Sequence, residues 1–67
     1  MDFAKILNEL RTANNMSQQE LAQKLNINQS NISNWERGIN RPEYEKLVSL
    51  ADIFGVTVDE LLGREGH

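Results

Sequence analysis

Five of the six residues between positions 29 and 34 have uncharged side chains that donate and accept hydrogen bonds. If this segment is a helix with Ile32 and Trp35 facing a core, its outward strip consists of Gln29, Ser30, Ser33 and Asn34, with Asn31 and Arg37 at the margins. Glutamine and asparagine amides bind adenine through N6 and N7, and serine pairs with several base edges. A surface that is merely solvated more often has Lys and Glu, which this strip lacks. The strip therefore favours contact with base edges in a DNA major groove over an ordinary solvated surface.

A second helix must hold this strip, and the sequence predicts one over residues 18–25, just before it. About three residues, 26–28, separate the two helices, and such a short turn favours a crossing of about 90–120°. Ala22 lies where the helices would pass closest, and its small side chain permits the approach. Asn26 tolerates the left-handed conformation that such a turn demands. The residues expected to form the shared core are apolar: Leu21, Leu25, Ile27, Ile32 and Trp35.

Three predicted helix starts have the same signature. Ser17 with Glu20, and Thr57 with Glu60, have the spacing of a capping box. Asn28 is the predicted N-cap of the helix over residues 29–37, which Gly38 ends. Each cap also lies between two apolar residues at the spacing of a hydrophobic staple: Met16 and Leu21, Ile27 and Ile32, Val56 and Leu61.

Two further helices and the short one after Thr57 complete an all-α prediction. Asp2 caps a first helix that ends at Asn14 and Asn15, and its apolar stripe is Phe3, Ile6, Leu7, Leu10 and Ala13. A loop over residues 39–41 leads to Pro42, where the fourth helix is expected to begin.

The fourth helix is expected to end at Gly55, and the fifth, over residues 58–62, is expected to end at Gly63. Side chains that the fourth helix should bury are Leu47, Val48, Leu50, Ala51 and Phe54. No segment alternates with period two, so we expect no sheet.

The composition is that of a small globular domain. The chain has 67 residues, of which 39% are hydrophobic and 25% charged. A domain of this size buries only about 60% of its unfolded surface, so its stability should be marginal. No apolar run approaches the roughly 20 residues of a membrane helix, and the N-terminus lacks the layout of a signal peptide. A cytoplasmic location is therefore expected.

Catalytic and metal-binding constellations are missing from the sequence. There is no cysteine, and the one histidine, His67, is the last residue and is expected in a solvated tail over residues 63–67. Asp59 and Glu60 are explained by the favourable effect of negative charge in the first turn of a helix. We therefore expect no enzyme, no metal site and no other cofactor.

The charge distribution opposes DNA binding in part, because nucleic-acid binders are usually basic and this chain has a net charge of −3. Residues 1–41 have five basic against four acidic side chains (+1), and residues 42–67 have two against six (−4). The acidic excess thus lies in the last third. One face can still meet DNA, but long-range steering will be weak.

The segment SQQELAQKLNINQSNISNWERGINRP, followed by LVSLADIFGVTVDELL, resembles the Xre-type helix-turn-helix family of phage Cro and repressor proteins. The resemblance spans about residues 3–62. It implies an all-α fold, the compact five-helix lambda-repressor-like DNA-binding domain, in which the second and third helices form the helix-turn-helix. Since 67 residues are too few for two independent cores, we expect one domain over residues 1–67. Two positions depart from the family pattern: Asn26 replaces a usual Gly, and Glu43 stands where a capping Ser is common.

The resemblance further implies roles for individual residues. Base edges would be contacted by Gln29, Ser30 and Asn34, and also by Asn31 and Ser33. Phosphates would be bound by Gln18 and Ser17 at the start of the second helix, where backbone N–H groups also favour an anion, and by Arg37, Asn40 and Arg41. Arg11 would form a structural ion pair with Glu36.

These observations predict a sequence-specific transcriptional regulator, a repressor by this resemblance, that binds double-stranded DNA at a pseudo-palindromic operator. One helix covers few base pairs, so we expect a homodimer on two half-sites. Its contact surface is expected among Val56, Val58, Leu61 and Leu62. Two alternatives stay open. The same fold could serve as a protein-interaction module of the antitoxin or anti-repressor kind, with the acidic last third as docking surface, or the chain could be one domain of a longer repressor.

Overall fold

The structure is a computed structural model that describes residues 2–63, so His67 lies outside the described residues. It contains five helices: α1 (Phe3–Ala13), α2 (Gln18–Leu25), α3 (Gln29–Glu36), α4 (Tyr44–Phe54) and α5 (Val58–Leu62). No strand occurs among residues 2–63, and the predicted all-α fold is confirmed. None of the helices in this range is long and apolar enough to cross a membrane.

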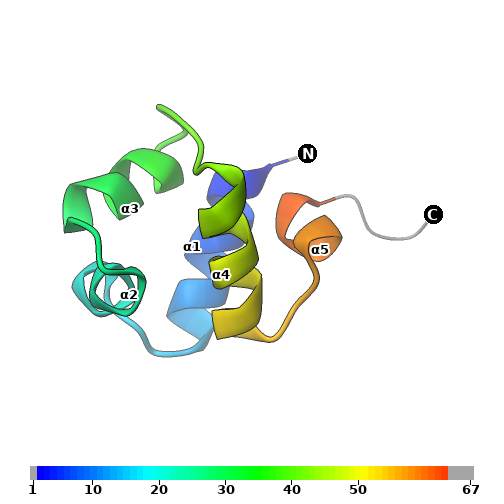
Figure 1. The fold of residues 1–67 in the computed structure, drawn as a ribbon, viewed down its shortest axis with the longest axis horizontal. Coiled ribbons are helices and arrows are strands. Elements are labelled where there is room, and N and C mark those ends of the chain that lie inside the picture. The colour runs from blue at the N-terminus through cyan, green and yellow to red at the C-terminus, as the bar shows by residue number, and fades with distance from the viewer. Residues whose placement is uncertain (1, 64–67) are drawn as a thin grey trace.

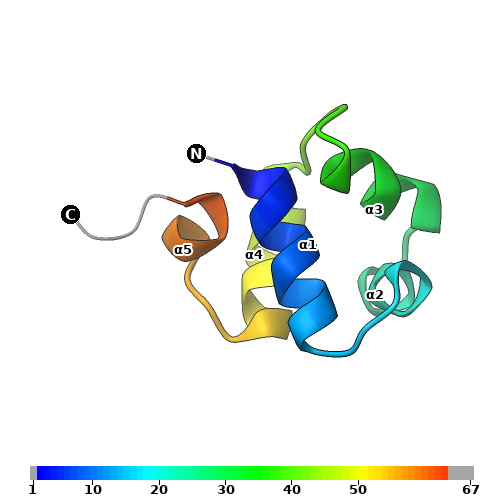
Figure 2. The ribbon, with the colours of Figure 1, turned by 180° about the vertical axis from the view of Figure 1, so that it is seen from behind.

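The α2–α3 pair lies at one end of the molecule and α5 at the other, with α1 and α4 between them (Figures 1 and 2). In Figure 1, α2 is seen nearly end-on while α3 runs across the view, so the two helices cross steeply, as the short turn predicts. Every helix contributes to one buried core, formed by Phe3, Leu7, Leu21, Ala22, Leu25, Ile32, Trp35, Leu50, Ala51 and Leu61. The position of α3 is therefore set by packing against the rest of the domain.

Both predicted capping boxes are present. The Glu20 backbone N–H donates to Ser17 Oγ at 3.0 Å, and the Ser17 N–H donates to Glu20 Oε1 at 2.8 Å. Thr57 and Glu60 make the same two bonds at 3.0 and 2.8 Å. Each pair satisfies two backbone groups that a helix start otherwise leaves without partners. The Lys5 N–H also donates to Asp2 Oδ1, which confirms the cap of α1.

The turn between α2 and α3 departs from the sequence prediction in one detail. Asn26 adopts the expected left-handed conformation, with φ of 59°. Asn28 occupies the N-cap position of α3, but its side chain makes no capping bond with the residues that the structure describes. Its carbonyl oxygen accepts the backbone N–H of Asn31 at 3.1 Å. The start of α3 is thus fixed mainly by its apolar anchors.

Three other predictions need correction. The last residue of α3 is Glu36, and Arg37 is its C-cap. Pro42 does not open α4, which begins at Tyr44 because Glu43 is extended, with ψ of 169°. Of the side chains that α4 should bury, only Leu50 and Ala51 are buried. Leu47 and Phe54 are half-buried and pack against the core, whereas Val48 is half-buried and lies beside the core-facing arc of the helix.

Leu61 is wholly buried, so it cannot belong to the exposed dimer surface predicted for it. Its side chain packs in the core instead. Val56, Val58 and Leu62, the other members of that predicted surface, are half-buried and pack against the core while keeping some exposure.

Candidate nucleic-acid interface

The polar face of α3 lies opposite its buried face, as the sequence predicts. Ile32 is 0% exposed and Trp35 only 6%. Gln29 and Ser30 are exposed, whereas Asn31, Ser33 and Asn34 are partly exposed. An eight-residue helix is about 12 Å long, so these side chains cover a short strip. The two apolar anchors prevent α3 from turning this strip toward the core.

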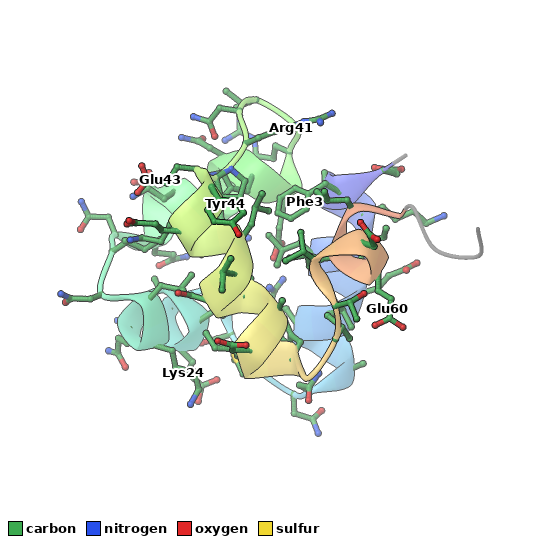
Figure 3. All side chains as sticks on the ribbon, turned by 45° about the vertical axis from the view of Figure 1, so that its right-hand side comes forward. Phe3, Lys24, Arg41, Glu43, Tyr44 and Glu60 are labelled. Carbon is green, nitrogen blue, oxygen red and sulfur yellow. The ribbon has the colours of Figure 1, made fainter. Side chains whose placement is uncertain are left out.

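The predicted phosphate contacts lie on either side of this strip. Ser17 is exposed at the N-terminus of α2, and its backbone N–H is already taken up by Glu20. Beyond the other end of α3, Arg37, Asn40 and Arg41 are all exposed on the connection to α4. Figure 3 shows Arg41 on this connection at one edge of the molecule and Lys24 on α2 at the opposite edge. Lys24 is therefore far from Arg41 on this connection.

An open cleft of about 310 Å³ lies between one side of α3 and the start of α4. Asn31 lines it from α3, Arg41 from the loop, and Lys46 from the first turn of α4, with the acidic Glu43 close by. Lys46 is one of only two Lys or Arg residues after position 41 and is not among the predicted phosphate contacts. The structure thus places a further positive side chain next to the predicted phosphate-binding residues.

Arg11 and Glu36 form the predicted ion pair, with Arg11 Nε 2.6 Å from Glu36 Oε2. Arg11 Nη2 donates to Glu36 Oε1 at 3.1 Å, and Nη1 donates to the Met16 carbonyl at 2.8 Å. The two side chains are 13% and 6% exposed. A bidentate pair with so little solvent around it holds its geometry better than a surface ion pair.

The ion pair continues into a chain of amides that sequence reasoning missed. Asn8 Nδ2 and Gln18 Nε2 donate to Glu36 Oε1 at 3.0 and 3.1 Å. Gln29 Nε2 in turn donates to Gln18 Oε1 at 3.2 Å. The partly buried pair is therefore connected through Gln18 to the first residue of α3. No local sequence pattern predicts these hydrogen bonds, because the residues that make them lie on three different helices.

The surroundings of Glu36 keep its carboxylate ionised. Burial alone would raise its pKa, but the hydrogen bonds from Arg11, Asn8 and Gln18 outweigh that effect and hold the pKa below the ordinary value. The same hydrogen bond to Glu36 raises the pKa of Arg11. Opposite charges thus persist on both partners at neutral pH.

Two helices joined by a tight turn, the second with a polar outward face, define a helix-turn-helix domain of the DNA-binding transcriptional-regulator class. A family model described as helix-turn-helix matches residues 7–61. The chain belongs to this family, in its Xre-like branch, and the predicted resemblance is confirmed.

Curated relatives share this segment. The chain is 42% identical over 65 residues to the HTH-type transcriptional activator BcrR of Enterococcus faecalis, covering 97% of this chain and 32% of that protein. It is 49% identical over 59 residues to the HTH-type transcriptional regulator AnsR of Bacillus subtilis, covering 88% and 51%. It is 33% identical over 64 residues to the cryptic phage CTXphi transcriptional repressor RstR of Vibrio cholerae, covering 96% and 57%. The chain thus spans about a third to three fifths of these relatives.

A solved structure has the same fold. The crystal structure of a transcriptional regulator from Listeria innocua superposes with a TM-score of 0.90 at 29% identity, covering 97% of this chain and 61% of that one. The similarity over nearly the whole chain confirms the predicted five-helix arrangement.

Proposed function

We propose that this chain is a sequence-specific DNA-binding domain that inserts α3 into the major groove of double-stranded DNA. The observation that supports this most is the neutral, exposed amide and hydroxyl strip on a helix whose opposite face is locked into the core. The strip offers paired donors and acceptors, which adenine matches through N6 and N7. On this proposal Gln29, Ser30 and Asn34 contact base edges, with Asn31 and Ser33 beside them.

Phosphate contacts on both sides would fix the register of α3 on the DNA. On one side of α3, the proposed phosphate contacts are made by Gln18 and the hydroxyl of Ser17. On the other side they are made by Arg37, Asn40 and Arg41. Because there are few cations and the net charge is −3, affinity should depend on correct bases more than on general attraction to phosphate. The proposal therefore includes weak non-specific binding.

The chain would act as a homodimer on a pseudo-palindromic site. Half-sites of such operators repeat about every 34–36 Å, one helical turn, so each copy would place its α3 in one of two successive major grooves. The partly exposed Val56, Val58 and Leu62 offer an apolar contact between copies.

Repression is the regulatory output we propose. Occupying a site that overlaps a promoter blocks transcription without any contact beyond those with DNA. The named relatives include an activator and a repressor, so a reporter assay with the selected operator at a promoter must decide. We also propose that residues 1–67 hold one such domain, with its core over about residues 3–62.

Selection from a random DNA library tests base recognition. The wild-type chain should enrich a common motif with adenine in each half-site. Gln29→Ala and Asn34→Ala should each lose preference at one position, by roughly 1–3 kcal/mol. Gln23→Ala, which removes an exposed amide from α2 outside the strip, is the control and should keep the motif. Enrichment of no common motif by the wild type would sink the proposal.

A protein-interaction module is the second candidate function, supported by the exposed acidic side chains of Asp52, Asp59 and Glu60 toward the α5 end. They could dock a basic partner. A stoichiometric protein partner, together with undetectable DNA binding at low salt, would favour this candidate over the first.

A further inference from the structure

In the chain of hydrogen bonds from Arg11 to Gln29, the Glu36 carboxylate determines which group donates and which accepts in each bond. Arginine offers only donors, an ionised carboxylate only acceptors, and each amide one end of either kind. Glu36 must therefore accept a hydrogen bond from the amide nitrogen of Gln18. The amide oxygen of Gln18 then faces Gln29. Gln29 must then turn its nitrogen toward Gln18. The orientation of both amides therefore follows from the acceptor-only chemistry of the Glu36 carboxylate, although the nitrogen and oxygen of an isolated amide could be interchanged.

The same order fixes what Gln29 offers to a ligand. With its nitrogen held by Gln18 at 3.2 Å, the amide oxygen of Gln29 is directed away from Gln18. Gln29 is exposed at the first position of α3, where that oxygen and the second N–H can meet a base edge. An outward acceptor beside a donor suits N6 and N7 of adenine, whereas guanine presents only acceptors there.

We propose that Glu36 is a positioning residue for base choice, acting through Gln18 to hold the Gln29 amide in the orientation that prefers adenine over guanine. This inference rests on the proposed function. It gives the ion pair with Arg11 a second role, because Arg11 holds Glu36 through two of its nitrogens while Glu36 orients Gln18.

Glu36→Met tests whether Glu36 orients the relay. The substitution removes the acceptor of the Gln18 nitrogen, so the carboxylate no longer fixes which end of the Gln18 amide faces Gln29. Gln29 can then present either end of its own amide outward, and the preference for adenine over guanine at this one position should fall roughly five-fold or more.

Glu36→Gln is the conservative variant that should keep the preference. Glu36 Oε1 accepts from Arg11, Asn8 and Gln18, whereas Oε2 accepts from Arg11 alone. The single oxygen of the new amide therefore satisfies most donors in the place of Oε1, where it still accepts from Gln18. Stability should drop with the lost charge, but the ratio of adenine to guanine should stay as in the wild type. A merely structural ion pair predicts that the two variants at position 36 change this ratio alike.

Two single variants complete the experiment. Gln18→Met leaves the Arg11–Glu36 pair intact and cuts the relay, so it should relax the preference even where Glu36→Met fails to fold. Asn8→Ala removes another donor to Glu36 that lies off the path to Gln29, and it should keep the preference.

Library selection with each variant, after its fold is verified by circular dichroism, decides the matter. Full adenine preference in folded Gln18→Met or Glu36→Met, or an equal loss in Glu36→Met and Glu36→Gln, overturns the inference and leaves the proposed function standing. Failure of the wild type to select any motif overturns both.

Discussion

Arg11 and Glu36 lie 25 residues apart in the sequence, and their side chains meet at 2.6 Å across the junction of α1 and α3. Arg11 also donates to the carbonyl of Met16, so one guanidinium joins α1, the turn before α2, and the end of α3. In a domain this small, such a polar clamp supplements a limited apolar core. It links the orientation of α3 to the protonation state of a single carboxylate.

Acid should weaken this clamp in a defined direction. The folded pKa of Glu36 lies below its ordinary value of 4.5, so the unfolded chain binds the proton more readily. The resulting stability is fully present above about pH 5 and is lost as the pH falls through the folded pKa. At pH 7, Glu36→Gln should lower the free energy of unfolding by about 1–3 kcal/mol, and that difference should shrink on acidification.

Urea unfolding of both proteins from pH 7 to pH 3 measures this effect. Glu9→Gln, which removes an exposed negative charge from α1, controls for the change in net charge. A difference between wild type and Glu36→Gln that stays constant over this pH range would contradict the predicted linkage.

The helix caps should differ in strength although their sequences look equivalent. Ser17→Ala removes the acceptor of the Glu20 N–H and should cost about 1 kcal/mol of unfolding free energy. Asn28→Ala should cost distinctly less, since the Asn28 side chain makes no capping bond within residues 2–63. Thermal unfolding of the two variants at pH 7 compares them directly. Equal losses would show that Asn28 caps α3 in solution after all.

Helix boundaries followed closely from the sequence wherever local chemistry sets them. The capping box at Ser17 and the left-handed Asn26 bound α2 as predicted, because both depend on residues within four positions. The start of α4 was misplaced because Pro42 is compatible with several extended or helical entries, and only the observed conformation of Glu43 selects one. The burial of Leu61 depends on how α5 meets the rest of the core.

The candidate site was predictable only to the level of a helix face. Alternation of Ile32 and Trp35 with polar residues shows which side of α3 is outward. The bond between Gln18 and Gln29, and its continuation to Glu36, joins side chains 11 and 18 positions apart. Such bonds depend on the crossing of helices and on rotamers, which no local pattern encodes.

The turn between α2 and α3 offers a test of backbone strain. At φ of 59°, a residue with a Cβ is disfavoured by roughly 1–2 kcal/mol, and Asn less than most. Asn26→Gly should therefore keep or raise the unfolding free energy, while Asn26→Ala should lower it by about 1 kcal/mol relative to Gly. Asn40, in a loop and without positive φ, is the matched position, where Gly should give no gain. Urea midpoints that rank Ala above Gly at position 26 would exclude this account.

Arg41 should contribute to affinity without contributing to base choice. It is exposed on the connection after α3, and on the proposed function it contacts a phosphate. Arg41→Ala should weaken binding to every sequence by about 1.5 kcal/mol, roughly tenfold, and reduce the slope of log K against log salt by about 1. Lys24→Ala removes the same charge at the opposite edge of the molecule (Figure 3) and should leave the slope unchanged. Fluorescence titrations of the selected DNA and a scrambled DNA at several salt concentrations measure both. A loss confined to the selected DNA would instead assign Arg41 to a base.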